Sequence, residues 1–436
     1  MALRATPPLY SARLIAALLL SMAGVGFAPQ VRGEDLLIQP LQPLAIDGLP
    51  LGTPPVLERS VELTSSSATT DTQAPVSAEV LDGRTIACSA ARNWIPSKAL
   101  RARGATIVQA YQDQPESAQQ AACALNQFLN MQATHQQDIG AASALRAYYT
   151  RIAIAEQLQL ADDSQHLVED EKAKQQAVRQ GGLAAVTDLS AFDRRRLEIE
   201  DQRLQLLSQD RQLRTLLAQL ALRDYGMHAA GQERLDVRPH PLDCARLQQL
   251  ALAGRCDLRG WTYLWRQTNE TSAPEFAKII STVVGGFGLP LPTMTGLKML
   301  LCPPDTEQLA DNMRRELSLT VETHRRWICQ AVEEKCAKLH LAYQRIELAQ
   351  QTIASWNERL KQLEQVEQMG KPDPEQLATA RIGWMTARAE EIARRLDARS
   401  AEIDLAESLG GLCNRCCSGQ AWLLTGHEAP EAAAQQ

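Results

Sequence analysis

Aromatic residues are scarce in this chain: Phe, Trp and Tyr together make up only 4% of its 436 residues. The thick core of an ordinary globular domain relies on such large side chains, so their scarcity argues against a string of globular domains. Ala, Gln, Leu, Arg and Glu dominate instead, from about residue 115 to 225 and again from 305 to 410. This composition is typical of long helices that pack through narrow apolar seams.

The sequence has no large excess of charge of one sign, and it contains none of the common catalytic motifs. Its net charge of -6 is spread along the chain, so no nucleic-acid partner is expected. It contains no phosphate-binding loop, no His-Glu-x-x-His pair and no nucleophile–base pattern. The seven His residues are scattered, and His324 and His340 are expected to be solvated. We therefore expect neither an enzyme nor a cofactor.

Cysteine is present ten times, but no four of these residues have the spacing of a zinc site. The run CNRCC contains Cys413, Cys416 and Cys417 and lacks a fourth ligand at normal spacing, although His427 is near. We expect disulfides or free thiols here, with zinc as the minor alternative. Cys329 and Cys336 lie on one predicted helix, roughly 10 Å apart along its axis, so they cannot bond to each other.

Long apolar runs are confined to the N-terminus. Arg4 and Arg13 precede the apolar stretch from Leu14 to Ala28, which ends in small residues. This pattern predicts that residues 1–28 are a signal peptide and that the chain is exported; a retained anchor helix is the alternative. Residues 29–82 are rich in Pro, Ser and Thr without periodicity and are predicted to be a flexible lead-in. Residues 413–436 are predicted to be a Cys-containing flexible tail.

One phrase occurs twice in the remaining chain. YTRIAIAEQ (Tyr149–Gln157) and YQRIELAQQ (Tyr343–Gln351) share five of nine positions. A repeat at this distance indicates one structural unit built twice. We assign the first repeat to residues 83–226 and the second to residues 303–412. Residues 227–302 between them are predicted to be a linker with a short helix and a reduced strand region.

The second repeat shows the plan of the unit. Asp305 can cap a helix that meets no Pro or Gly before Gly370, about 64 residues or ~95 Å in length. Gly370 can end this helix. Asp373 can then cap a return helix that starts at Pro374 and reaches Leu409. The sequence thus predicts a long antiparallel helical hairpin.

The first repeat follows the same plan. A helix is predicted from about Pro115 to Gln180, where Gly181 and Gly182 break it. Asp188 can cap a return helix that ends near Tyr225 and Gly226.

Apolar residues at spacings of three, four and seven predict coiled-coil seams along these helices. The outgoing helix of the second repeat carries Leu339, Ala342, Ile346, Ala349, Ile353, Trp356, Leu360 and Leu363. Its return helix carries Ile382, Met385, Ala389, Ile392, Leu396, Ile403 and Ala406, with Arg399 breaking the series. The return helix of the first repeat carries Phe192, Ile199, Leu206, Leu213 and Leu220. Tyr149 and Tyr343 are interpreted as packing residues of these seams.

Shorter elements precede both long helices. Helical stretches are predicted at Leu242–Glu270 and roughly at Arg84–Tyr111. The segment Ile279–Met294, with β-branched residues and interrupting Gly and Pro, is predicted to be non-helical.

The order of these phrases resembles the TolC-type outer-membrane efflux protein family. LALAGRCDLRGW (Leu250–Trp261) is similar to the phrase that opens a repeat in that family. Tyr148–Tyr149 and Ala342–Tyr343 match the upper parts of its two long helices. GGLAAVTDL (Gly181–Leu189) and GKPDPEQL (Gly370–Leu377) look like its hairpin tips. The resemblance covers roughly residues 85 to 412, and it implies a divergent member.

The resemblance implies a mainly α protomer with two repeated long antiparallel coiled-coil hairpins. The family tops these hairpins with a β-barrel, but this chain departs from that pattern: the stretches before its two long helices lack strand pairs, so little or no β structure is predicted. Three copies would form a helical conduit in the periplasm, at the outer membrane, working with a periplasmic adaptor and an inner-membrane transporter. The residues implied to contact the adaptor are Gly181, Gly182, Asp188, Leu189, Gly370, Asp373 and Leu377. The alternative is a periplasmic coiled-coil scaffold that lacks the family's β-barrel and has lost transport.

Overall fold

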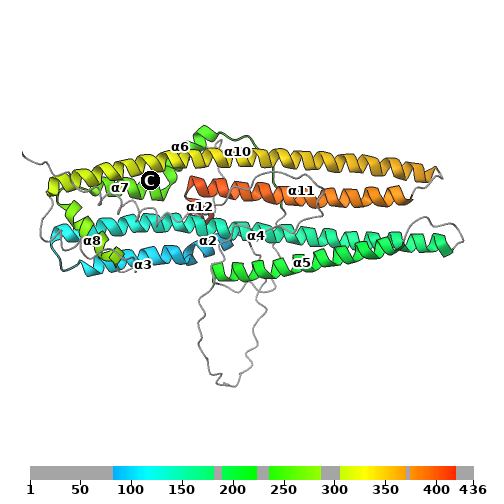
Figure 1. Cartoon of the computed structure of the whole chain (residues 1–436), viewed down its shortest axis with the longest axis horizontal. Helices are drawn as coiled ribbons and strands as arrows, with labels where there is room; N and C mark the ends of the chain where they lie inside the picture. The colour runs from blue at the N-terminus through cyan, green and yellow to red at the C-terminus, as the bar shows by residue number, and fades with distance from the viewer. Residues whose placement is uncertain (1–81, 181–188, 223–234, 286–304, 370–373, 419–436) are drawn as a thin grey trace, which may run out of the picture. The chain divides into compact units, whose positions relative to one another are not determined.

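The computed structural model describes residues 82–180, 189–222, 235–285, 305–369 and 374–418 (Figure 1). They belong to one compact unit, Gln73–Gln436, and they form helices, turns and extended linkers without any strand. The prediction of a mainly α fold with two long antiparallel hairpins is confirmed. No helix in the described ranges combines the length and apolar character needed to cross a membrane.

The first hairpin consists of α4 (Glu116–Gln180) and α5 (Leu189–Ala221). Two shorter helices, α2 (Gly83–Asn93) and α3 (Ile95–Ala110), lie along the N-terminal half of α4, and α5 lies along its C-terminal half (Figure 1). The 65-residue α4, about 98 Å long at ~1.5 Å per residue, therefore has a partner over most of its length.

The predicted end of α5 near Tyr225 is wrong by four residues. The Ala221 carbonyl accepts hydrogen bonds from Ser89 Oγ (3.2 Å) and Asn93 Nδ2 (2.8 Å) of α2. Leu222 then takes a left-handed conformation with a φ of 50°, which helix propagation does not allow. Helix α5 ends here because α2 caps its last carbonyl, a contact between residues 128 and 132 positions apart.

The second hairpin consists of α10 (Thr306–Gln368) and α11 (Pro374–Leu409), with the bounds that the sequence predicts. Asp305 caps α10 by accepting the Glu307 N–H at 3.2 Å. Helices α6 (Cys244–Gly254) and α7 (Cys256–Gln267) lie against the N-terminal half of α10. The second unit thus repeats the arrangement of the first.

Close packing of the predicted seam residues holds the second hairpin together. Leu339, Ile346, Ile392, Leu396 and Ile403 are buried. Near the end of the hairpin, the seam narrows to a cluster of Leu363, Leu377 and Ala380, with Trp356 and Leu360 beside it. The core is a stripe between helices, which explains why so few aromatic residues suffice.

The described part of the linker, residues 235–285, contains three helices where one was predicted, because α8 (Ser272–Gly285) follows α6 and α7. The prediction that the chain is non-helical from Ile279 is therefore wrong as far as Gly285. Asn269 Oδ1 accepts the N–H groups of Thr271 and Ser272 and starts the helix. Phe276 and Ile279 are buried, and α8 packs against α4 and α10, so tertiary burial overrides the weak helix propensity of the β-branched residues.

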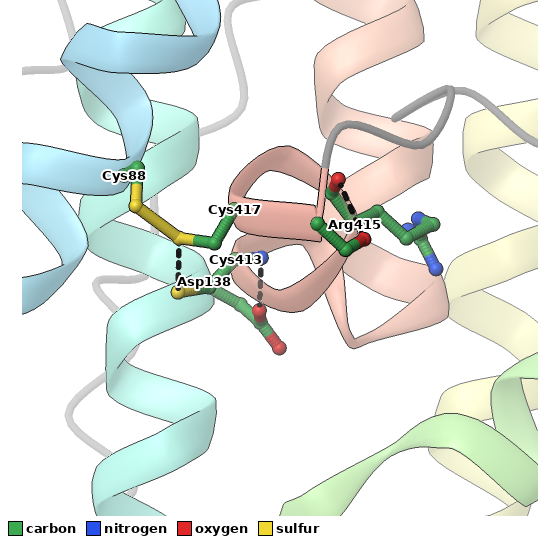
Figure 2. The surroundings of a disulfide bond; sticks show 6 residues. Cys88, Asp138, Cys413, Arg415 and Cys417 are labelled. Carbon is green, nitrogen blue, oxygen red and sulfur yellow. Dashed lines mark hydrogen bonds between the residues drawn. A yellow bond between two sulfur atoms is a disulfide. The ribbon is translucent and has the colours of Figure 1, made fainter.

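The predicted flexible tail begins with a helix, α12 (Leu412–Ser418). Asp138 of α4 accepts the N–H groups of Gly411 and Cys413, each at 2.8 Å. Figure 2 shows that the same short helix is joined to α2 by a disulfide between Cys88 and Cys417. The tail prediction is thus wrong for residues 413–418. The signal peptide, the lead-in up to residue 81 and the tail from 419 lie outside the described residues and stay predictions.

Glycine at position 383 is required by the Trp356 ring. A Cβ atom on Gly383 would lie 2.6 Å from the indole. We expect Gly383→Ala to lower the free energy of unfolding by about 1–3 kcal/mol, measured by urea denaturation. In a Trp356→Ala background the methyl group has room, and helix propensity favours Ala over Gly by ~1 kcal/mol, so the same change should stabilise. An effect of the same sign in both backgrounds would contradict this packing.

Candidate functional site

The hairpin ends are the predicted site, and most of their residues lie outside the described ranges: Gly181, Gly182, Asp188, Gly370 and Asp373. Leu189 is the first residue of α5 and is half-buried. Leu377 is buried in the cluster with Leu363 and Ala380. The described end of the second hairpin is therefore stabilised by its own apolar contacts, and an adaptor contact by these seven residues stays a prediction.

A buried carboxylate joins the two hairpins toward these ends. Glu171 of α4 is bound by Lys174 at 2.9 Å and by Arg381 of α11 at 2.5 Å. The side chain of Glu171 is only 5% exposed, whereas that of Lys174 is 60% exposed. A buried carboxylate needs such partners, so Arg381 fixes α11 against α4 at this level.

A second polar contact joins three of the long helices. Arg146 of α4 donates to Asp404 Oδ1 of α11 at 3.0 Å and also to Glu407. Lys338 of α10 donates to the other oxygen of Asp404 at 2.9 Å. Burial alone would raise the pKa of Asp404, but the charges of Arg146 and Lys338 lower it. Asp404 therefore remains ionised and links α4, α10 and α11 at one level.

The two copies of the repeated phrase meet on opposite sides of Arg399 and Glu402 in α11. The Tyr343 hydroxyl donates to Glu402 at 2.9 Å, and Arg399 donates to the other oxygen of Glu402 at 2.6 Å. The Arg399 guanidinium lies 4.9 Å from the centroid of the Tyr149 ring. Both tyrosines are buried, as packing residues should be. Arg399, which interrupts the predicted seam, thus contacts the Tyr149 ring. It also binds Glu402, which accepts the hydrogen bond from Tyr343.

The repeat-opening phrase forms a buried ion pair. Arg255 donates to Asp257 through Nε at 2.9 Å and through a terminal nitrogen at 2.6 Å. Their side chains are 6% and 5% exposed. Burial would raise the pKa of Asp257, but the hydrogen bonds from Arg255 and the nearby charges lower it to about 2. This bidentate pair fixes the junction between α6 and α7.

Side chains from α4 and α10 close around this pair. His135 Nε2 of α4 lies 3.9 Å from Asp257, and the His324 ring of α10 stacks on Trp261 with centroids 6.0 Å apart. Burial lowers the pKa of both histidines, so each is held in its neutral form. The prediction that His324 is solvated is wrong. His324 lies three residues after Val321 and four before Ile328, and both of these are buried. This apolar spacing could have predicted that His324 faces the packed side of α10.

The polar arrangement described above consists of contacts between helices. In the described part of the chain, no three His, Cys, Asp or Glu side chains are placed to hold a metal ion. The buried carboxylates of Glu171, Asp257 and Glu402 and the half-buried carboxylate of Asp404 are each bound to a cation. Glu171, Glu402 and Asp404 join long helices side by side through Arg381, Tyr343 and Lys338, whereas Asp257 fixes the junction of α6 and α7.

The outer long helices carry exposed apolar rows. Helices α4 and α11 contact each other, while α5 contacts α4 and α10 contacts α11 (Figure 1). Leu197, Leu204 and Leu207 on α5 are exposed. On α10 the exposed apolar residues at comparable angles around the helix are Leu319, Leu341, Leu348 and Val366, and Met369 follows directly after its end. Each hairpin thus presents an apolar face that the described protomer does not cover.

Loss of the buried ion pair at the repeat-opening phrase should destabilise the whole unit. Asp257→Asn leaves Arg255 buried without its carboxylate, and we expect a loss of about 3 kcal/mol at pH 7, measured by denaturant unfolding. As pH falls from the usual carboxyl pKa of 3.8 through the lowered pKa of about 2, the parent loses most of this contribution, because Asp257 becomes protonated. The gap between parent and variant should therefore close in acid.

The exposed pair Arg238–Asp236 provides the matched control. Asp236→Asn should change stability by less than about 0.5 kcal/mol, since exposed pairs contribute little. Equal effects of the two substitutions at pH 7, or a gap that is as large at pH 2 as at pH 7, would show that the buried pair is not a stabilising element.

The sequence matches no protein-family model and no curated protein. The outer-membrane channel OprN matches with a TM-score of 0.58 and 11% identity, over 76% of this chain and 90% of that one. CusC matches at 0.58 and 12%, over 79% and 100%. The open-state Neisseria gonorrhoeae MtrE outer membrane channel matches at 0.54 and 14%, over 81% and 96%. The chain therefore has the fold of the TolC-family outer-membrane channels.

Proposed function

We propose that this chain is a channel component of the TolC type. Three copies form a helical conduit in the periplasm, at the outer membrane, and the hairpin ends engage a periplasmic adaptor that connects to an inner-membrane transporter. The role is passive transport, without catalysis or a cofactor. The observation that carries the proposal is the pair of exposed apolar rows on the two outer long helices, α5 and α10.

These rows reach the same level along the hairpins. Lys338, Asp404 and Arg146 are bonded together and define a common level on α10, α11 and α4. On α10, Leu348 lies ten residues, or about 15 Å, closer to the hairpin end. Leu348, which belongs to the exposed row of α10, thus lies about 15 Å from this common level in the direction of the hairpin end.

The row on α5 can be placed against the same level. Arg151 of α4 lies five residues toward the hairpin end from Arg146 and binds Asp210 of α5 at 3.0 Å. Leu207 and Leu204 lie three and six residues further along. They are therefore about 12 Å and 16 Å from the common level, on either side of the height of Leu348. In a ring of identical protomers, α5 of one copy can meet α10 of the next leucine to leucine.

The length of the helices and the similar structures support the same role. Helices of 63 and 65 residues are about 95 Å and about 98 Å long, far longer than the helices of a globular core. The matched structures include outer-membrane channels. The adaptor contact is assigned to Gly181, Gly182, Asp188, Leu189, Gly370, Asp373 and Leu377 through the resemblance of the hairpin tips.

The oligomer interface is tested by introducing charge. We expect the mature protein to be a trimer in detergent by mass measurement. Leu348→Glu together with Leu207→Glu should weaken assembly at least about tenfold, since like charges then face each other. Leu348→Glu with Leu207→Lys should restore much of it. Ile95→Glu, at an exposed site on α3, is the matched control and should leave the trimer intact.

Circular dichroism of each variant checks that the helical fold is retained. A parent that stays monomeric with and without detergent would contradict the conduit. Release of the protein by osmotic shock or salt washing, without detergent, would contradict the outer-membrane location and favour the periplasmic scaffold instead.

A further inference from the structure

We propose that Cys413 is a nucleophile for the Cys88–Cys417 disulfide: it attacks Cys417, releases Cys88 and moves the bond from between α2 and α12 to within α12. Cys413 Sγ lies 3.9 Å from Cys417 Sγ while Cys417 is bonded to Cys88. Figure 2 shows Cys413 Sγ on the far side of Cys417 Sγ from Cys88 Sγ. Because exchange is a displacement at sulfur, the attacking thiolate must approach from the side opposite to the leaving sulfur.

Backbone contacts keep Cys413 next to the bond. Asp138 of α4 accepts the N–H groups of Gly411 and Cys413, each at 2.8 Å, and thereby fixes the first turn of α12. Cys417 lies four residues after Cys413, so the two side chains share one face of this helix. None of these contacts involves α2. Helix α12 can therefore keep its place on α4 after the bond to Cys88 is broken.

The exchange is internal and needs neither an oxidant nor a reductant. Cys413 loses its proton to solvent, and its thiolate forms a bond to Cys417 Sγ. The Cys88–Cys417 bond breaks, and its electron pair leaves on Cys88 Sγ, which takes up a proton. One S–S bond and one S–H bond are present among the three residues before and after the step.

Burial keeps this exchange slow at neutral pH. It raises the pKa of the Cys413 thiol to about 11, and the charge of Asp138 acts in the same direction, whereas Arg92 of α2 and Arg101 of α3 lower it. The thiolate of Cys413 is therefore scarce at pH 7, and its population rises about tenfold with each pH unit below this pKa. The resting protein thus retains the bond to α2, and the exchange accelerates as pH rises.

The product bond requires a small local change. Side chains four residues apart on a helix have Cβ atoms about 5–6 Å apart, whereas a disulfide needs about 3.5–4.5 Å. The last turn of α12 has to tighten by about 1–2 Å. Only seven residues form this helix, and Cys417 is the last but one of them, so the adjustment stays at its end.

The exchange changes how α2 is attached to the rest of the chain. The Cys88–Cys417 bond joins residues 329 positions apart, whereas a Cys413–Cys417 bond spans one helical turn and closes almost no loop. After exchange, α2 still donates hydrogen bonds from Ser89 and Asn93 to the end of α5. Its covalent attachment to the end of the second hairpin is lost, so α2 can then separate from α12.

Peptide mapping tests the proposal on the full mature chain. The oxidised protein, free of added thiols, is held at pH 7 or pH 9, stopped with acid, alkylated with N-ethylmaleimide and digested with pepsin without reduction. We expect molecules with alkylated Cys88 and a Cys413–Cys417 bond to form about a hundredfold faster at pH 9 than at pH 7. The rate should not depend on protein concentration, because the step is internal.

Two variants of α12 separate this exchange from other thiol reactions. Cys413→Ser should keep the Cys88–Cys417 bond at both pH values. Cys416→Ser removes the other buried thiol of the same helix and is the matched control, which should exchange like the parent.

A Cys88–Cys417 bond that persists in the parent at pH 9 would overturn the proposal. Exchange in Cys413→Ser at the rate of the parent would overturn it as well, and so would a bond from Cys417 to any cysteine other than Cys413. If Cys413→Ser does not fold, the map of the parent decides the outcome, since the new bond identifies the attacking residue.

Discussion

The contact between α4 and α11 is the constraint on which the rest of the structure depends. Each hairpin buries only a narrow seam of its own, so the two hairpins need each other to cover their inner faces. Polar contacts fix their register along this contact: Arg381 with Glu171, Arg399 with Tyr149, and Arg146 with Asp404 and Glu407. Sliding one hairpin by a single turn would leave these buried groups without partners, which costs several kcal/mol for each charge.

The contact between α4 and α11 also explains the repeated phrase that begins at Tyr149 and Tyr343. Tyr149 and Tyr343 come from different repeats, yet both reach the same turn of α11, one under Arg399 and the other bonded to Glu402. Because α11 lies between the two long helices, it can receive equivalent residues from both sides. The same geometry leaves α5 and α10 with a single long-helix neighbour each. Their exposed leucine rows are what makes a ring of copies, and hence a conduit, the proposed role.

Local signals in the sequence were sufficient for the long elements. The absence of Pro and Gly between Asp305 and Gly370, and the cap before Pro374, predicted the bounds of α10 and α11. Spacing predicted their seams. The failures involve contacts across the chain: α12 is held by Asp138, over 270 positions away, and α5 is stopped by side chains of α2. At the candidate site, Leu377 was predicted only as a residue of the hairpin tip, and its burial was not predicted. The ion pairs of Glu171 and Asp404 join residues far apart in the chain, so no spacing in a single sequence predicts them.

Hydrogen exchange measured residue by residue tests the central contact most directly. If the α4–α11 contact holds the hairpins together, the backbone amides around Arg146 in α4 and from Arg399 to Glu407 in α11 should exchange more slowly than those of α5 and α10 beyond the contact. They should also open together, with one common free energy, as denaturant is added. Fast exchange in this part of α11 while α4 stays protected would mean that the hairpins separate, and it would contradict the account.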